Sequence, residues 1–104
     1  MILEVAVLNV RAGQGDAFVS TFRQASPLIA SIPGYVGHEL QKCVETPDQY
    51  LLLVYWETLE AHTVGFRQSA AYQEWKALLH PFYDPFPLVE HYEKVLSYPT
   101  ANPK

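Results

Sequence analysis

Four segments with strand character and two with helical periodicity alternate along this chain, in an order that few folds accommodate. The expected strands are Ile2–Val10, Tyr35–Glu45, Tyr50–Glu57 and Leu88–Val95, and the expected helices run from Asp16 to Ser31 and from Thr58 to His80. Within the second helical segment, Ser69 is a candidate start of a new helix. The order β-α-β-β-α-β predicts an α+β, ferredoxin-like fold, which is a four-stranded antiparallel sheet with both helices on one face. We expect a single domain over residues 1–96 and a C-terminal tail over residues 97–104.

Local signals set the ends of these elements. Asp16 is a plausible N-cap of the first helix, and Pro33-Gly34 ends it. The turn at Thr46–Asp48 joins the second and third strands as an antiparallel hairpin. Strict alternation along the second strand predicts that Tyr35 and His38 lie on opposite faces of the sheet.

The first and third strands are apolar at almost every position, so each is expected to be covered on both faces. Two helices can cover only one face of a four-stranded sheet. A second copy of the same sheet is the simplest cover for the other face, which predicts a homodimer through the open sheet face. The alternative is that a few outward Leu and Val side chains are simply exposed, as is common on protein surfaces.

Charge and composition exclude several classes of function. The chain has 104 residues, with 7 Lys and Arg against 11 Asp and Glu, and no two of its cations are adjacent. This pattern gives no support for nucleic-acid binding. The longest apolar run, Tyr50–Trp56, is far shorter than the ~20 residues of a membrane helix. The single cysteine, Cys43, excludes an internal disulfide and fits a reducing, cytoplasmic location.

Sequence motifs for cofactors and metals are missing. Gly13 and Gly15 would need a third glycine at position 18 to resemble a dinucleotide-binding loop, but Phe18 stands there. The histidines have no paired metal-ligand spacing; they are His38, His62, His80 and His91. We therefore expect no bound cofactor and no metal.

Most chemistry-bearing side chains gather in the second helical segment. They are His62, Phe66, Arg67, Tyr72, Trp75 and His80. His62 shares a helix face with apolar Leu59 and Phe66, which points it toward the core. It is therefore either a base that works near its own pKa or a structural histidine bonded to a backbone carbonyl.

The neighbouring side chains also have two interpretations. Tyr72 and Trp75 are either core packing or the walls of a slot for an aromatic ligand, and Trp56, at the end of the third strand, is either core or pocket wall. Arg67 is either a solvated surface residue or an inward partner for a phenolate or enolate oxygen.

Three segments carry a resemblance to a known family: Val54–His62 (VYWETLEAH), Pro33–Tyr35 and Val89–Glu93. A Trp at the end of this strand, followed by Ala-His in the next helix, resembles the antibiotic biosynthesis monooxygenase (ABM) family of the dimeric α+β barrel superfamily. The resemblance covers residues 2–96 and implies a ferredoxin-like homodimer whose sheets pack face to face. For the characterised members it also implies oxygenation of phenolic or quinol-type substrates by O2 without metal, haem or flavin.

The resemblance assigns expected roles to individual residues. A substrate that has lost a proton passes an electron to O2 itself, so the protein needs a base, an anion partner and a dry aromatic pocket. His62 and Arg67 are then the candidate catalytic residues. The candidate substrate-binding residues are Trp56, Phe66, Tyr72 and Trp75. The expected function is a cofactor-independent monooxygenase for a small aromatic or quinol, with its pocket between the sheet and the second helix.

Two alternative functions remain open. The first is a non-catalytic dimer that binds a small apolar molecule, since fold alone does not establish an enzyme. The second is a haem-degrading relative, for which Asn9, Trp75 and His80 are the corresponding residues. Trp75 and His80 lie closer together than that group's spacing requires, which disfavours haem degradation.

Overall fold

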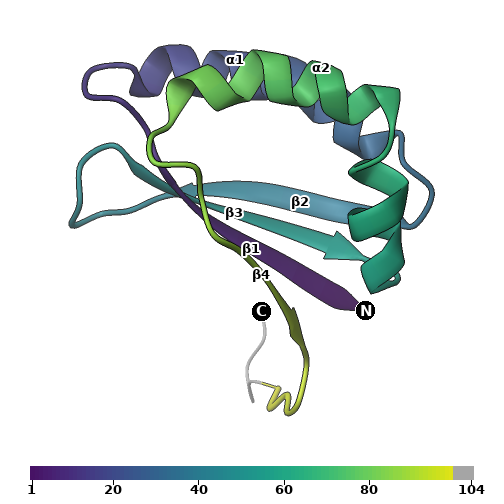
Figure 1. Ribbon diagram of the computed structural model, residues 1–104. Coiled ribbons are helices and arrows are strands. Elements are labelled where there is room, and N and C mark those ends of the chain that lie inside the picture. Colours follow the sequence, from purple (N-terminus) through teal and green to yellow (C-terminus); the bar gives the residue numbers. More distant parts are fainter. Residues whose placement is uncertain (100–104) are drawn as a thin grey trace.

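All four predicted strands and both predicted helices are present in the computed structural model, which describes residues 1–99 (Figure 1). The strands are β1 (Ile2–Asn9), β2 (Tyr35–Lys42), β3 (Gln49–Trp56) and β4 (Val89–Glu93). The helices are α1 (Gly15–Ala30), the π-helix η1 (Ala61–Phe66), α2 (Ala70–Leu79) and the 3-10 turn η2 (His80–Phe82). The predicted tail is described only as far as residue 99, and its remaining residues, 100–104, lie outside the described part.

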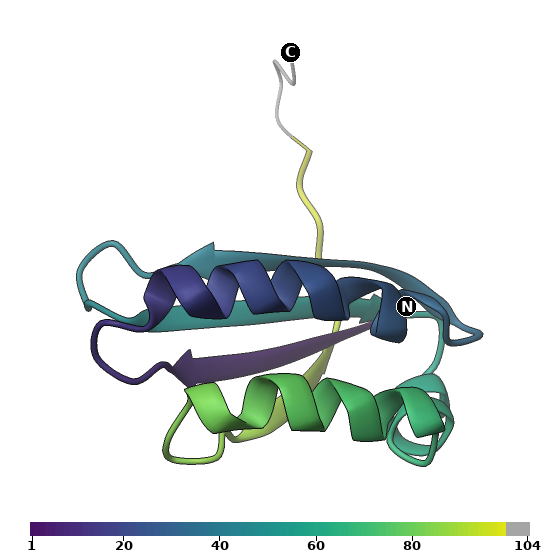
Figure 2. The same cartoon turned by 90° about the horizontal axis from the view of Figure 1, so that it is seen from above.

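The strands form one antiparallel sheet in the order β2-β3-β1-β4, and both helices lie on the same face of it (Figures 1 and 2). The two central strands, β1 and β3, are therefore the two whose sequences are apolar at almost every position. This arrangement confirms the predicted ferredoxin-like fold.

The core fills the space between the sheet and the helices. Helix α1 contributes four buried residues at helical spacing, Phe18, Phe22, Ala25 and Ile29. Alternate residues of the two central strands meet them: Ala6 and Leu8 from β1, Leu52 and Val54 from β3. The start of α1 lies close to β3. A Cβ at Gly15 would come within 2.6 Å of the Tyr50 hydroxyl. Glycine at position 15 thus leaves room for the Tyr50 hydroxyl beside the start of the helix.

Two local predictions were wrong. Helix α1 begins at Gly15 after Gln14, so Asp16 lies in the first turn and is not the N-cap. Tyr35 and His38 lie on the same, helix-covered face, because a bulge between Tyr35 and Gly37 shifts the register of β2. The Tyr35 hydroxyl consequently donates a hydrogen bond to Nδ1 of His38.

The opposite face of the sheet has no helix over it among residues 1–99 (Figure 1). Its central rows are apolar: Leu3, Val5 and Val7 from β1 and Leu51, Leu53 and Tyr55 from β3. Val7 and Tyr55 are exposed, and the others are partly so.

Candidate active site

A small cavity lies between the sheet and the second helical region, where the resemblance to the ABM family predicted a pocket. Its walls come from all four helical elements, from β1, β3 and β4, and from the loop between η2 and β4. The lining residues are Glu4, Ala6, Leu8, Ile29, Leu52, His62, Phe66, Arg67, Tyr72, Trp75, His80, Tyr83, Phe86, Pro87 and Val89. The cavity volume is about 40 Å³, which is room for a few water-sized molecules and too little for an aromatic ring. An aromatic substrate can therefore enter only if part of the wall moves.

Four side chains next to this cavity form a continuous chain of polar contacts. Trp56 donates from Nε1 to Oε1 of Glu4 across 2.9 Å. The same carboxylate oxygen lies 3.4 Å from Nε2 of His62. On the other side of the ring, Nδ1 of His62 lies 2.7 Å from Nε2 of His91. Glu4 and His62 are both buried, with 6% and 2% of their surface exposed, while His91 on β4 is only half-buried.

Burial favours the neutral form of both inner groups. It lowers the pKa of His62 to about 3, and the positive charge of Arg67 and the nearby His91 act in the same direction. Burial also raises the pKa of the Glu4 carboxyl, although the Trp56 hydrogen bond and the Arg67 charge lower it in part. His62 is therefore neutral near pH 7, and its 3.4 Å contact with Glu4 is not an ion pair. We assign the His62 proton to Nε2, facing Glu4, so that Nδ1 accepts the Nε2 proton of His91.

Sheet register brings Glu4 and His91 to the same place. Glu4 is directly opposite Val54 on one side and His91 on the other, and it points to the helix-covered face. His62 comes from η1, the teal-green helix beside the end of β3 in Figure 1. The entry to this helix is fixed by the Thr58 hydroxyl, which accepts a hydrogen bond from the Ala61 amide across 3.1 Å.

The Pro33–Tyr35 link, one of the segments that resembled the ABM family, has a clear packing role. Gly34 adopts a φ of 91°, a backbone conformation that favours glycine. A Cβ at this position would also come within 2.7 Å of the Ala61 side chain at the start of η1. Gly34 thus allows η1, and with it His62, to approach the sheet.

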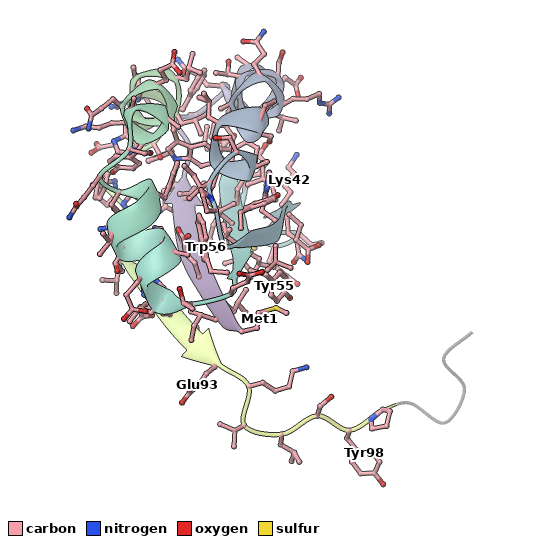
Figure 3. The ribbon with its side chains drawn as sticks, turned by 90° about the vertical axis from the view of Figure 1, so that its right-hand side faces the viewer. Met1, Lys42, Tyr55, Trp56, Glu93 and Tyr98 are labelled. Carbon is pink, nitrogen blue, oxygen red and sulfur yellow. The ribbon has the colours of Figure 1, made fainter. Side chains whose placement is uncertain are left out.

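Five of the six predicted site residues are brought together at the cavity: His62, Phe66, Arg67, Tyr72 and Trp75. Arg67 remains exposed at the rim, whereas Phe66 and Trp75 are buried. Trp56 does not line the cavity. Its ring stacks behind His62, with a centroid distance of 5.4 Å and an angle of 20°, and it is fully buried inside the molecule (Figure 3).

Sequence reasoning missed Glu4, His91 and the loop residues that close the cavity. Glu4 had a detectable signal, since it is the lone charged residue in the otherwise apolar segment ILEVAVLNV. His91 had none, because its pairing with His62 depends on the register between β1 and β4. In the closing loop, Phe86 packs edge-on against His80 with a centroid distance of 4.9 Å.

The residues considered for haem degradation do not share one site. Trp75 and His80 line the cavity. Asn9 is exposed and belongs to the alternate set of β1 positions, on the sheet face opposite to Glu4, Ala6 and Leu8.

A second hollow lies between α1 and β2, with a volume of about 510 Å³ and a wide opening to solvent. His38 on its wall is held by Tyr35 and by Ser26, whose Oγ lies 3.0 Å from Nε2 of His38. The Ser26 hydroxyl itself donates to the Phe22 carbonyl across 2.9 Å. These bonds occupy both ring nitrogens of His38. The groove is also wide open to solvent, so it cannot exclude water from a reacting substrate, and it is not our candidate site.

Comparison with known proteins shows to which family the chain belongs. The sequence model of the antibiotic biosynthesis monooxygenase family matches residues 1–78. The chain belongs to this family. The result confirms the predicted family, and no helix among residues 1–99 of this ABM protein is long and apolar enough to cross a membrane.

Individual proteins are also similar to this chain. Protein YczJ of Bacillus subtilis is 56% identical over 95 residues, which cover 91% of this chain and 100% of YczJ. The crystal structure of a Bordetella bronchiseptica protein assigned to the same family is 40% identical, with a TM-score of 0.87 over 91% of this chain and 97% of that one. SnoaB from Streptomyces nogalater, a cofactor-independent oxygenase, is 19% identical with a TM-score of 0.79, over 95% of this chain and 97% of SnoaB. At that identity the likeness to SnoaB shows a shared fold alone.

Proposed function

We propose that this ABM protein is a cofactor-independent monooxygenase that oxygenates a small phenolic or quinol-type aromatic with O2. One observation carries the proposal: Glu4, His62 and His91 form a continuous chain of acid–base groups, and its two inner members face a largely apolar cavity. The fold shared with SnoaB, a cofactor-independent oxygenase, supports it.

A phenol can react with O2 in steps that need only acid–base help. Loss of the hydroxyl proton gives an electron-rich phenolate, which passes an electron to O2 and then binds the reduced oxygen at a ring carbon as a peroxide. The peroxide takes up a proton and its O–O bond breaks. The ring carbon loses its hydrogen as water forms, which leaves a quinone. One phenol and one O2 thus give one quinone and one water, and the substrate supplies all the electrons.

The substrate proton is accepted by the Glu4–His62 pair acting as a unit. His62 alone is a weak base, because burial lowers its pKa to about 3. Burial raises the pKa of the Glu4 carboxyl, which makes the carboxylate the stronger base of the two. His91, at the outer end of the chain, connects the pair to the partly exposed side of β4.

Arg67 binds the charged part of the substrate, and the aromatic walls bind its apolar part. The guanidinium of Arg67 lines the cavity at its exposed rim, where it stabilises a phenolate oxygen. Phe66, Tyr72 and Trp75 form the apolar wall. Because the cavity measures only about 40 Å³, we infer that the loop carrying Phe86 swings outward to admit the substrate.

We further propose that the protein is a cytoplasmic homodimer in which the apolar sheet faces of two copies pack together. The apolar rows of β1 and β3 on that face support this arrangement, since large apolar surfaces without a cover are unusual on monomers.

Oxygen-isotope labelling tests the activity directly. The purified protein is mixed with a naphthol under ¹⁸O2, and both oxygen uptake and the mass of the product are measured. The expected product is a quinone with one labelled oxygen, and the other labelled atom appears in water. Formation of hydrogen peroxide with no label in the organic product would contradict a monooxygenase.

Variants separate an enzyme from a module that only binds aromatics. His62→Gln and Glu4→Gln should each lower the turnover rate on the order of 10²–10⁴-fold while the aromatic probe still binds, since the walls remain. His38→Gln is the matched control, because His38 lies in the groove between α1 and β2. If naphthol binds saturably but is never oxygenated by the unaltered protein, the binding function replaces the enzyme.

A further inference from the structure

The chain after β4 forms an extended apolar arm, residues 94–99, that leaves the body of the molecule. Its large side chains face solvent almost completely: Val95 is 95% exposed, Leu96 83% and Tyr98 90%. Figure 1 shows the arm on the helix-free side of the sheet, and in Figure 2 it extends beyond the outline of the body. Three neighbouring apolar side chains at such exposure are a strong sign of a missing contact.

An apolar hollow lies on the open sheet face near the root of this arm. Leu3 is directly opposite Tyr55 on β3 and Tyr92 on β4, so the three side chains form one row across the sheet. The hollow around them has a volume of about 310 Å³, and Met1 and Lys94 also line it. In Figure 3, Tyr55 and Met1 lie together at this end of the sheet, while Tyr98 is far out on the arm.

We propose that the arm of one copy packs into this hollow on a second copy, so that two arms clasp the homodimer reciprocally. This inference rests on the face-to-face dimer proposed above. Leu96 and Tyr98 of each arm would cover the Tyr55–Leu3–Tyr92 row of the other copy.

Symmetry and the direction of the arm favour a second copy over any other occupant. The arm projects on the side where a sheet stacked on the open face would sit (Figure 1). A second copy on that face brings its own arm and its own hollow, so a two-fold axis forms the same contact twice. The chain's own hollow is an unsuitable partner, because Lys94 at the root of the arm already forms part of its wall.

Crosslinking between two different single-cysteine proteins tests the contact. Both carry Cys43→Ser, which removes the natural cysteine. One then carries Tyr55→Cys and the other Leu96→Cys, and the mixture is treated with a short bismaleimide after subunit exchange. We expect a covalent heterodimer. In the control, the second protein carries Val44→Cys in place of Leu96→Cys. Val44 is 93% exposed but follows β2 near the opposite end of the sheet, so no covalent heterodimer should form.

Two further measurements show whether the proposed arm contact alone is wrong or whether the proposed face-to-face dimer is wrong as well. A chain shortened after Lys94 should dimerise more weakly, with a dissociation constant higher by on the order of tenfold or more, as measured by sedimentation. An unchanged dissociation constant, or a link formed only within one chain in the Tyr55→Cys, Leu96→Cys double variant, would overturn the arm contact and leave the face-to-face dimer standing. An unaltered protein that sediments as a monomer at all concentrations would overturn both.

Discussion

The indole of Trp56 donates a hydrogen bond of 2.9 Å from Nε1 to Oε1 of the buried Glu4. The same oxygen faces Nε2 of His62 at 3.4 Å, and the Trp56 ring stacks on the His62 ring. One tryptophan therefore positions both members of the proposed acid–base pair without lining the cavity. Trp56 is a positioning residue, and the wall function expected for it belongs to its neighbours.

Replacing Trp56 by Phe should destabilise the fold by about 1–3 kcal/mol, because a buried carboxyl loses its donor. Urea unfolding followed by circular dichroism gives this value. Trp75→Phe removes an indole of similar burial that, among residues 1–99, donates to no carboxylate. The Trp75→Phe variant should therefore lose less stability than Trp56→Phe. An equal loss of stability in the two variants would mean that the side-chain volume of Trp56 matters and its hydrogen bond does not.

Stability should fall on acidification because of His62. Its pKa is lowered from 6.5 to about 3 in the folded state, so between these values the unfolded chain binds more protons than the folded one. His62 thus adds a loss of up to about 1.4 kcal/mol per pH unit as the pH falls from 6.5 toward 3. The raised pKa of Glu4 acts in the opposite direction, because protonation of that carboxyl favours the folded state.

The free energy of unfolding, measured by urea titration at several pH values, checks this prediction. His62→Gln should show a shallower decrease below pH 6.5 than the unaltered protein. His38→Gln serves as the comparison, since burial lowers the pKa of His38 as well but that residue lies on the far side of α1 from the cavity. Parallel curves for the unaltered protein and His62→Gln would contradict the assignment of a neutral, buried His62.

Phe86→Ala should speed the entry of aromatic molecules with little change in stability. Phe86 lines the cavity but is 63% exposed, so its removal should alter stability by only about 0.5 kcal/mol. Stopped-flow fluorescence of naphthol binding measures the entry rate. Leu88→Ala is the matched control, because Leu88 is 74% exposed in the same loop and does not line the cavity.

Adjacent residues of β3 should respond differently to a new charge. Leu53 lies on the open face opposite Val5, so Leu53→Asp should give a folded monomer, as judged by sedimentation and circular dichroism. Val54 is fully buried opposite Glu4, so Val54→Asp should unfold the chain. A Leu53→Asp variant that remains dimeric would exclude the open face as the interface.

Several features of the site could be predicted because they depend on local sequence. His62 and Phe66 lie on η1, Arg67 directly follows it, and Tyr72 lies on α2. All four come from the one sequence segment predicted to be helical, which brings them to a common region. The restart of the helix at Ser69 is also a local matter, since the Ser69 hydroxyl accepts a hydrogen bond from the Tyr72 amide across 3.1 Å.

Other features depend on chain segments that are distant in sequence. Glu4 and His91 meet only through the antiparallel register of β1 and β4. The bulge after Tyr35 reverses the expected orientation of that side chain, because a single extra residue changes which face each position occupies.

Local sequence patterns were enough to predict the order of the elements, the ferredoxin-like topology and the helical segment that carries most of the site, because periodicity and turn residues act over a few neighbouring positions. The packing of distant segments was needed to establish that Trp56 supports Glu4 from behind, that His62 is neutral between Glu4 and His91, and that the cavity is small. Strand register and burial set those properties, and both depend on how residues far apart in the chain pack together.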